Sequence, residues 1–167
     1  MSFSLIPNYS FCNLFDVSPE FLKELGIKFL MFDLDNTIAA YNEHSPSSVM
    51  STWLEDIRSS GVELFIISNS NRTHRVESFA KAFNVDFFLN ASKPSPKSVY
   101  NAMDCAGYNT CESALVGDQI FTDTLAANRA GVVSIIVRPR RFTNFFLAIR
   151  YFIEIPIRAM CRNKKKY

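Results

Sequence analysis

The sequence has only four cysteines in 167 residues, and their arrangement excludes the common zinc sites. No two of them form a CxxC pair, and none has a histidine partner at the spacing that zinc-binding motifs use. We therefore interpret them as buried free thiols of a protein in a reducing cytosol. They are Cys12, Cys105, Cys111 and Cys161.

Segments that divide or export a chain are also missing. There is no Gly/Ser-rich or Pro-rich linker and no internal repeat, and charged residues make up only 20% of a chain that is 48% hydrophobic. This composition argues against disorder and is sufficient for one buried core. Residues 1–15 lack the early positive charge and the cleavage site of a secretory signal. We expect a single domain in the cytoplasm.

Charge is distributed unevenly along the chain. Residues 138–167 contain nine Lys or Arg and one acidic residue, so this segment has a net charge of +8. Residues 1–137 contain nine basic and fifteen acidic residues, which gives a net charge of −6. Such a basic segment is typical of a region that contacts something anionic, such as a membrane surface or a nucleic acid.

Strand-like and helix-like segments alternate through the middle of the chain. Short apolar runs have the pattern of buried strands, and the segments between them have helical length and periodicity. This alternation predicts an α/β fold with a doubly wound, mainly parallel, Rossmann-like sheet. The expected strands are 29–32, 62–67, 86–89, 113–117 and 132–137, and the expected helices are 48–60, 72–83, 95–106 and 121–129.

The most informative stretch is FLMFDLDNT at positions 29–37. Its apolar run predicts a buried parallel strand, and Asp33 and Asp35 follow that strand at the edge where open α/β sheets keep their active sites. Residues two apart in an extended strand share a face. The two carboxylates are therefore placed to act on one reacting group, one as nucleophile and one as acid or base.

Polar residues also follow the other expected strands. They include carboxylates, a hydroxyl and a lysine, a set that suits phosphoryl transfer better than hydride transfer or acyl chemistry. Mg²⁺ prefers oxygen ligands together with substrate phosphate, and a lysine offsets the charge of a phosphoryl group. These residues are Ser68, Asn69, Lys93, Asp118 and Asp123.

The order DxDNT, SN, KP and GDQIFTD resembles the four-motif signature of the haloacid dehalogenase superfamily of aspartate-based phosphatases. The resemblance covers residues 28–137. Within subclass IIIA it extends to the YqeG-like branch, which is similar to the mitochondrial phosphatidylglycerophosphate phosphatases. We therefore expect a phosphatase domain with an N-terminal extension at residues 1–137. From the residues of the C-terminal segment we expect a basic amphipathic helix and tail at 138–167, packed on the same single domain.

The resemblance also implies a role for each motif residue. Asp33 would attack phosphorus and form an aspartyl-phosphate, and Asp35 would act as general acid and then as general base. Mg²⁺ would be bound by the carboxylates of Asp33 and Asp118 and by the backbone carbonyl of Asp35, with Asp123 supporting the site. The phosphate-binding residues would be Thr37, Ser68, Asn69 and Lys93.

No cap domain fits between the motifs. Segments 38–47 and 70–92 have room only for the expected helices, strands and loops. Many members of this superfamily close an inserted cap over a small substrate and so exclude water. An uncapped site is expected to admit a large substrate, such as a lipid head group at a bilayer or a phosphoprotein.

The C-terminal segment carries an apolar stripe at helical spacing. Two interpretations stay open: the stripe packs on the sheet as the last helix of the domain, or it contacts a membrane. A spanning helix is not expected, because Arg150, Glu154 and Pro156 interrupt the apolar run well short of the ~20 residues that a bilayer requires. The stripe consists of Phe142, Phe145, Phe146, Ile149, Phe152 and Ile153.

The sequence therefore predicts a Mg²⁺-dependent phosphomonoester hydrolase, with phosphatidylglycerophosphate as the leading substrate and peripheral contact with an anionic membrane at its inner face. One alternative is a soluble phosphatase of nucleotides or sugar phosphates. Another is a non-catalytic scaffold that binds membrane or RNA. The acid pair argues against a scaffold, because two carboxylates close together are costly without a metal. The basic tail has no recognisable RNA-binding module, so nucleic acid is not an expected partner.

Overall fold

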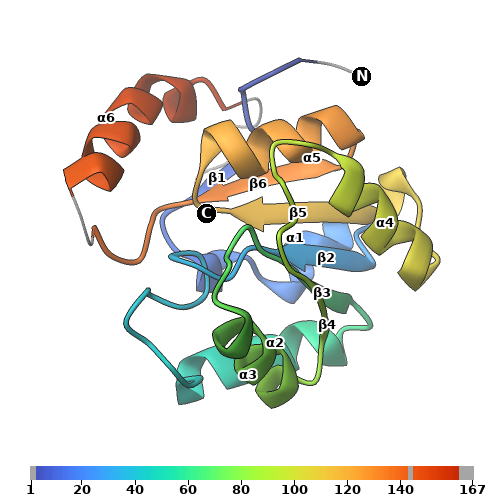
Figure 1. The fold of residues 1–167 in the computed structure, drawn as a ribbon. Helices are drawn as coiled ribbons and strands as arrows, with labels where there is room; N and C mark the ends of the chain where they lie inside the picture. Colours follow the sequence, from blue (N-terminus) through green and yellow to red (C-terminus); the bar gives the residue numbers. More distant parts are fainter. Residues whose placement is uncertain (1–2, 143–144, 162–167) are drawn as a thin grey trace.

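The computed structural model of the chain describes residues 3–142 and 145–161, apart from the side chain of Phe146 (Figure 1). Its centre is a six-stranded sheet in the order β1-β6-β5-β2-β3-β4, and each neighbouring pair is parallel. The strands are β1 (Tyr9–Phe11), β2 (Phe29–Phe32), β3 (Glu63–Ile67), β4 (Asp86–Phe88), β5 (Ser113–Gly117) and β6 (Val133–Val137). The predicted doubly wound α/β fold is confirmed.

Helices lie on both faces of this sheet (Figure 1). The α-helices are α1 (Pro19–Glu24), α2 (Ser48–Ser59), α3 (Thr73–Phe83), α4 (Lys97–Ala106), α5 (Leu125–Ala130) and α6 (Phe145–Ala159). Shorter helical turns are η1 (Leu14–Asp16), η2 (Thr110–Glu112) and η3 (Ile120–Thr124).

The central strand β2 is buried on both faces, because its side chains alternate between two hydrophobic clusters. Leu30 and Phe32 belong to the cluster that contains residues of α1, α2 and α3. Phe29 and Met31 belong to the cluster that contains residues of α4 and α5. A strand buried in this way needs a continuous apolar run rather than an alternating one, which is the pattern of its sequence.

Local sequence accounts for the helix that precedes β3. The Ser47 hydroxyl accepts a hydrogen bond from the Met50 N–H at 3.3 Å and so caps the start of α2. After the helix, Gly61 has φ +86°, a left-handed conformation that glycine adopts without strain. The expected helix at 48–60 therefore agrees with α2 to within one residue.

Several elements differ from the sequence-based expectations. Strand β1 and helix α1 were not predicted, because three residues and six residues are too short for a clear periodic pattern. The expected helix at 121–129 begins instead with the π-helical turn η3. The prediction of buried thiols was wrong for three cysteines: only Cys161 is buried, whereas the exposed ones are Cys12, Cys105 and Cys111.

The connections at the carboxyl edge of the sheet are short. Residues 33–47 join β2 to α2, and residues 68–72 join β3 to α3, so neither connection in the described structure contains an inserted cap domain. Among the described helices, none is long and apolar enough to cross a membrane.

Candidate active site

The predicted site residues follow β2, β3, β4 and β5 at the carboxyl edge of the sheet. The chain runs from β2 outward to β3 and β4, then returns to β5 on the other side of β2. The strand order therefore reverses between β2 and β5, and open α/β sheets bind ligands in the crevice at such a point. Asp33 follows β2 and Asp118 follows β5, so the two carboxylates flank this crevice.

Lys93 is the centre of the site. Its side chain is almost fully buried, and its Nζ lies 2.7 Å from Asp33 Oδ1 and 2.7 Å from Asp123 Oδ1. The same Nζ donates a hydrogen bond to the carbonyl of Ile67 at 2.8 Å. A buried ammonium group is costly unless it is paired and hydrogen-bonded, and these three oxygens meet that requirement.

The Asp33 carboxylate is held through both oxygens. Oδ1 accepts from Lys93, and Oδ2 accepts a hydrogen bond from the Thr37 hydroxyl at 3.4 Å. The Asp33 N–H donates to the carbonyl of Val116 at 3.0 Å, which continues the pairing of β2 with β5 by one residue. The carboxylate therefore has a defined orientation at the end of the strand.

Asn69 holds the backbone of Lys93. Its Nδ2 donates to the Lys93 carbonyl at 2.9 Å, and its Oδ1 accepts from the Lys93 N–H at 2.9 Å. The neighbouring Ser68 is buried, and its hydroxyl accepts from the Ser70 N–H at 3.0 Å. In this structure, Asn69 therefore positions Lys93, while Ser68 shapes the turn that follows β3.

Gly117 allows Asp123 to reach Lys93. A Cβ at position 117 would clash with the Asp123 carboxyl group, so this place at the end of β5 requires a glycine. Asp123 lies on η3, and its Oδ2 accepts a hydrogen bond from the Gln119 N–H at 3.1 Å. The spacing from Gly117 to Asp123 thus follows from the close approach of the η3 turn to β5.

Asp35 has a partner that the sequence analysis did not identify. Arg75 of α3 forms a buried ion pair with Asp35 Oδ1. The Arg75 guanidinium also donates to the carbonyl of Ala40 at 2.8 Å and to the carbonyl of Glu43 at 3.0 Å. Arg75 thereby ties the Asp35 side chain to the loop between β2 and α2.

Helix α6 closes another side of the site. The Arg158 guanidinium donates to the carbonyls of Val137 and Asp118 and to the Glu154 carboxylate. Glu154 Oε1 in turn accepts from the Ile120 N–H at 3.0 Å. These buried contacts hold the segment after β5, which carries Asp118.

Sequence reasoning missed these arginines and Glu154 because their partners are distant along the chain. Arg75 is 40 residues from Asp35, and Arg158 is 40 residues from Asp118. Each lies in a segment of helical pattern, where a charged residue most often faces solvent. No spacing signal in one sequence distinguishes a buried arginine from an exposed one.

Burial dominates the electrostatics of the site. It raises the pKa of Asp33 to about 7, against the opposing attraction of Lys93. It also raises the pKa of Asp118 well above its ordinary value, and the nearby carboxylates of Asp123 and Asp33 raise it further. For Lys93, burial lowers the pKa, but the Asp123 and Asp33 carboxylates outweigh that effect and the pKa is raised.

The residues at the crevice fit a divalent cation. Asp118 is fully buried, and neither of its carboxylate oxygens has a hydrogen-bond partner among the described residues. Arg150 of α6 forms an ion pair with this carboxylate, with 3.8 Å between Arg150 Nη2 and Asp118 Oδ2. Burying a carboxylate that accepts no hydrogen bond beside other carboxylates is costly, and a cation that takes oxygen ligands would reduce that cost.

The described side chains form no metal site of three or more Asp, Glu, His or Cys residues. Asp33 and Asp118 supply two carboxylates at the crevice, so a further ligand would have to be a backbone carbonyl, water or substrate phosphate. Mg²⁺ usually keeps several such ligands and takes only one or two carboxylates from the protein.

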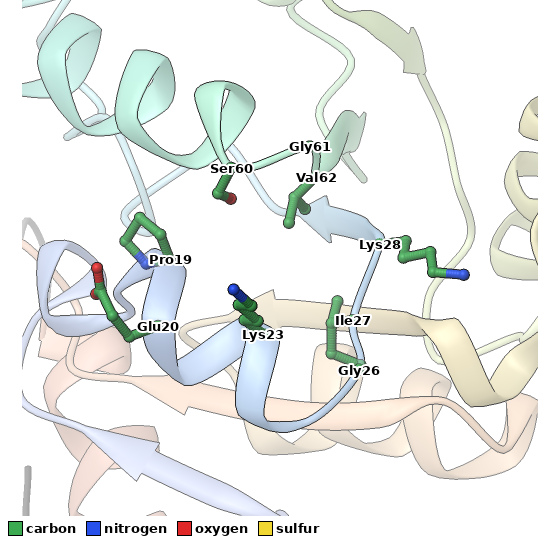
Figure 2. A pocket seen from close by; sticks show the side chains of 9 residues that line it. All are labelled: Pro19, Glu20, Lys23, Gly26, Ile27, Lys28, Ser60, Gly61 and Val62. Carbon is green, nitrogen blue, oxygen red and sulfur yellow. The ribbon is translucent and has the colours of Figure 1, made fainter.

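A separate cavity of about 490 Å³ lies at the opposite edge of the sheet. Figure 2 shows it between the end of α1, the start of β2 and the turn before β3, lined by Lys23, Ile27, Lys28 and Val62 among others. None of the predicted site residues lines this cavity. The chemistry is therefore assigned to the carboxyl edge.

A family model described as "Mitochondrial PGP phosphatase" matches residues 2–140. The chain belongs to this family. It is a phosphatase of the haloacid dehalogenase superfamily. Such a phosphatase is a phosphoric monoester hydrolase and acts on phosphorylated substrates, so the predicted enzyme class is confirmed. The chain is also 29% identical over 161 residues to the probable phosphatase YqeG of Bacillus subtilis (strain 168), an alignment that covers 96% of this chain and 92% of that protein.

Two solved structures share the fold of this PGP phosphatase family member. A cobalt-bound deoxy-D-mannose-octulosonate 8-phosphate phosphatase (YrbI) from Haemophilus influenzae has a TM-score of 0.56 and 16% identity, with 77% of each chain covered. An uncharacterized protein from Listeria monocytogenes serotype 4b also has a TM-score of 0.56, at 14% identity, with 77% of this chain and 99% of that chain covered. At these identities the likeness concerns the fold alone.

The close contact between Gly117 and the Asp123 carboxyl group leads to a testable prediction. Gly117→Ala should displace Asp123 from Lys93, destabilise the protein by about 1–3 kcal/mol and lower activity roughly a hundredfold. Urea unfolding and hydrolysis of a soluble phosphomonoester measure the two effects. In the control Gly61→Ala, the added Cβ meets open space at a positive φ, so stability should fall by about 1 kcal/mol with activity intact. Full activity in Gly117→Ala would contradict the assignment.

The raised pKa of Asp33 leads to a second prediction, which concerns the pH dependence of stability. Its pKa is about 7 in the folded chain and near 3.8 when unfolded. Between these values the folded state binds more protons, so the Asp33 contribution to stability is lost as pH rises from about 4 to about 7. In EDTA, Asp33→Asn should therefore gain stability relative to wild type over this range, by up to about 4 kcal/mol. Urea unfolding at about pH 4.5 and about pH 7.5 tests this, and a pH-independent difference would refute it.

Proposed function

We propose that this phosphatase hydrolyses phosphatidylglycerophosphate in a Mg²⁺-dependent reaction that proceeds through an aspartyl-phosphate on Asp33. The observation that carries the proposal is the Asp33 carboxylate at the sheet crevice, oriented by Lys93 at 2.7 Å. The matching family model supports the choice of substrate.

Asp33 is the proposed nucleophile. One carboxylate oxygen attacks the phosphorus of the terminal monoester, the bond from phosphorus to the ester oxygen breaks, and the alcohol product leaves. Lys93 neutralises charge on the carboxylate and then on the transferring phosphoryl group. Thr37, which donates to Asp33 Oδ2, keeps the carboxylate oriented for this step.

Asp35 is the proposed general acid and base. In its protonated form Asp35 gives a proton to the leaving alkoxide, and the resulting carboxylate later takes a proton from the water that hydrolyses the aspartyl-phosphate. Arg75 fixes the position of the Asp35 side chain through their buried ion pair. Water attack releases inorganic phosphate and restores the Asp33 carboxylate.

The remaining motif residues would bind phosphate and metal. Ser68, together with the Lys93 that Asn69 holds, would contact phosphoryl oxygens. Phosphatases of this superfamily generally use Mg²⁺. The ion would be held by the carboxylates of Asp33 and Asp118 and by the Asp35 carbonyl, with Asp123 in support. When bound, it supplies positive charge to the phosphoryl oxygens.

The lack of an inserted cap in the described connections supports a lipid substrate. No cap is inserted in the described connections after β2 and β3, so a head group still attached to a bilayer can enter. We infer that the enzyme meets this substrate from the cytoplasm, as a peripheral protein at the inner face of an anionic membrane. The basic C-terminal segment supports this location by its charge.

Phosphate release from phosphatidylglycerophosphate in mixed micelles tests the proposal. Wild type should release phosphate with Mg²⁺ and none with EDTA. Asp33→Asn should lower turnover at least about a thousandfold, because the amide is a poor nucleophile. Asp86→Asn is the matched control: Asp86 is an exposed residue of β4 outside the site, and this variant should keep full activity.

Each other outcome would revise a different part of the proposal. Metal-dependent release only from soluble nucleotide or sugar phosphates would keep the mechanism and overturn the lipid substrate. Normal turnover in Asp33→Asn would remove Asp33 as the nucleophile. No release from any phosphomonoester would favour the scaffold alternative.

A further inference from the structure

Helix α6 exposes apolar side chains and buries charged ones, which is the opposite of an ordinary surface helix. Phe145 is 75% exposed, Phe152 is 68% exposed and Ile153 is 57% exposed. The interpretation of the stripe as core is therefore wrong for the residues described, and Phe146 lies outside them.

Seven of the ten exposed large apolar side chains in the described structure lie on α6 or next to its ends. Phe142 precedes the helix and packs against Tyr151, with 5.1 Å between the ring centroids. The other six are what we call the outer face: Phe145, Ile149, Phe152, Ile153, Ile155 and Met160.

The opposite side of α6 contacts the active site through buried charges. Glu154 and Arg158 are 1% and 8% exposed, and they bond each other and the segment after β5. Rotating the helix to bury its apolar residues would break the bonds of Arg158 to Asp118 and of Glu154 to Ile120. Exposure of the outer face is therefore a consequence of how α6 supports the site, because without these bonds the backbone N–H of Ile120 and the carbonyls of Asp118 and Val137 would lose their partners.

The positive charge near the outer face indicates which kind of partner it binds. The exposed residues Arg138 and Arg141 precede α6, and the sequence after it contains Arg162 and three consecutive lysines. A second copy of the chain would bring two segments of net charge +8 together, which is unfavourable. Anionic phospholipid combines a negative surface with an apolar layer beneath it, and so complements both features.

The helix is suited to lie along a bilayer. Its 15 residues extend about 22 Å, less than the ~30 Å hydrocarbon layer. Its exposed apolar residues lie opposite its buried charged residues Glu154 and Arg158, as in helices that bury one side at the lipid interface. The polar face is already occupied by contacts with the sheet edge, near the arrowhead end of β5 (Figure 1).

We propose that α6 inserts its outer face into the surface of an anionic phospholipid bilayer and thereby places the crevice between Asp33 and Asp118 beside the membrane. The inference rests on the proposed function, because membrane binding would let a lipid substrate reach the site without leaving the bilayer. Binding of the outer face to lipid depends on its exposure and on the nearby charge, so it can be measured without any turnover.

Co-sedimentation of the full chain with vesicles tests the proposal. Vesicles of phosphatidylglycerol and phosphatidylcholine should bind the wild type, pure phosphatidylcholine should bind it more weakly, and high salt should reduce binding. Ile153→Gln should weaken partition about tenfold, since the side chain no longer gains from insertion. Val49→Gln is the matched control, because Val49 on α2 is also 57% exposed and should not affect binding.

The outcomes separate this proposal from the proposed function. Equal binding of wild type and Ile153→Gln, or equal loss in Val49→Gln, would overturn it, provided thermal unfolding shows both variants folded. A dimeric wild type that becomes monomeric in Ile153→Gln and does not bind vesicles would assign the face to a second copy instead. Failure to hydrolyse phosphatidylglycerophosphate would leave the vesicle result unchanged, since no substrate is present in that assay.

Discussion

The buried ammonium of Lys93, held between the carboxylates of Asp33 and Asp123, is the interaction around which the rest of the site is arranged. A charge in this position requires close partners, and the surrounding structure provides them at the sheet edge. Gly117 leaves space for the Asp123 carboxyl group, and the Asn69 side chain holds the Lys93 backbone from the neighbouring strand. The carboxyl ends of β2, β3 and β5 are thus joined by one set of buried polar contacts.

Asp118 is the exception within this arrangement. Its carboxylate is buried without a hydrogen-bond partner in the described structure, while its carbonyl accepts from Arg158 of α6. The backbone at this point is therefore fixed and the carboxylate is left available for a cation or substrate. The same contacts turn the polar side of α6 inward and leave apolar residues such as Phe152 in solvent. Support of the site and exposure of an apolar helix face have one structural cause.

The fold class and several site residues could be predicted because reactive side chains directly follow apolar strand patterns in the sequence. The apolar run before Asp33 and the alternation of strands and helices were sufficient for the fold class, because parallel strands must be apolar on both faces and must be joined by crossovers. Lys93 and Asp123 were chosen from their places after strands, and the structure brings both to Asp33. Exposure of the cysteines was mispredicted, because thiols have little polarity and their burial depends on packing. Arg75 was missed, because its partner Asp35 is 40 residues away.

Residue patterns and spacing were sufficient to predict the parallel α/β fold, the motif carboxylates with their lysine, the lack of a cap between the motifs and the basic charge of the last 30 residues. These properties depend on local patterns, on spacing and on counts of residues. The pairing of the charges and the choice of the buried face of α6 became known from the three-dimensional arrangement. A helical pattern shows that polar and apolar residues lie on opposite sides, but not which side meets the protein. In this structure the inward side is the one whose Glu154 and Arg158 bond backbone groups of the segment after β5, and these partners cannot be identified from the pattern of the helix.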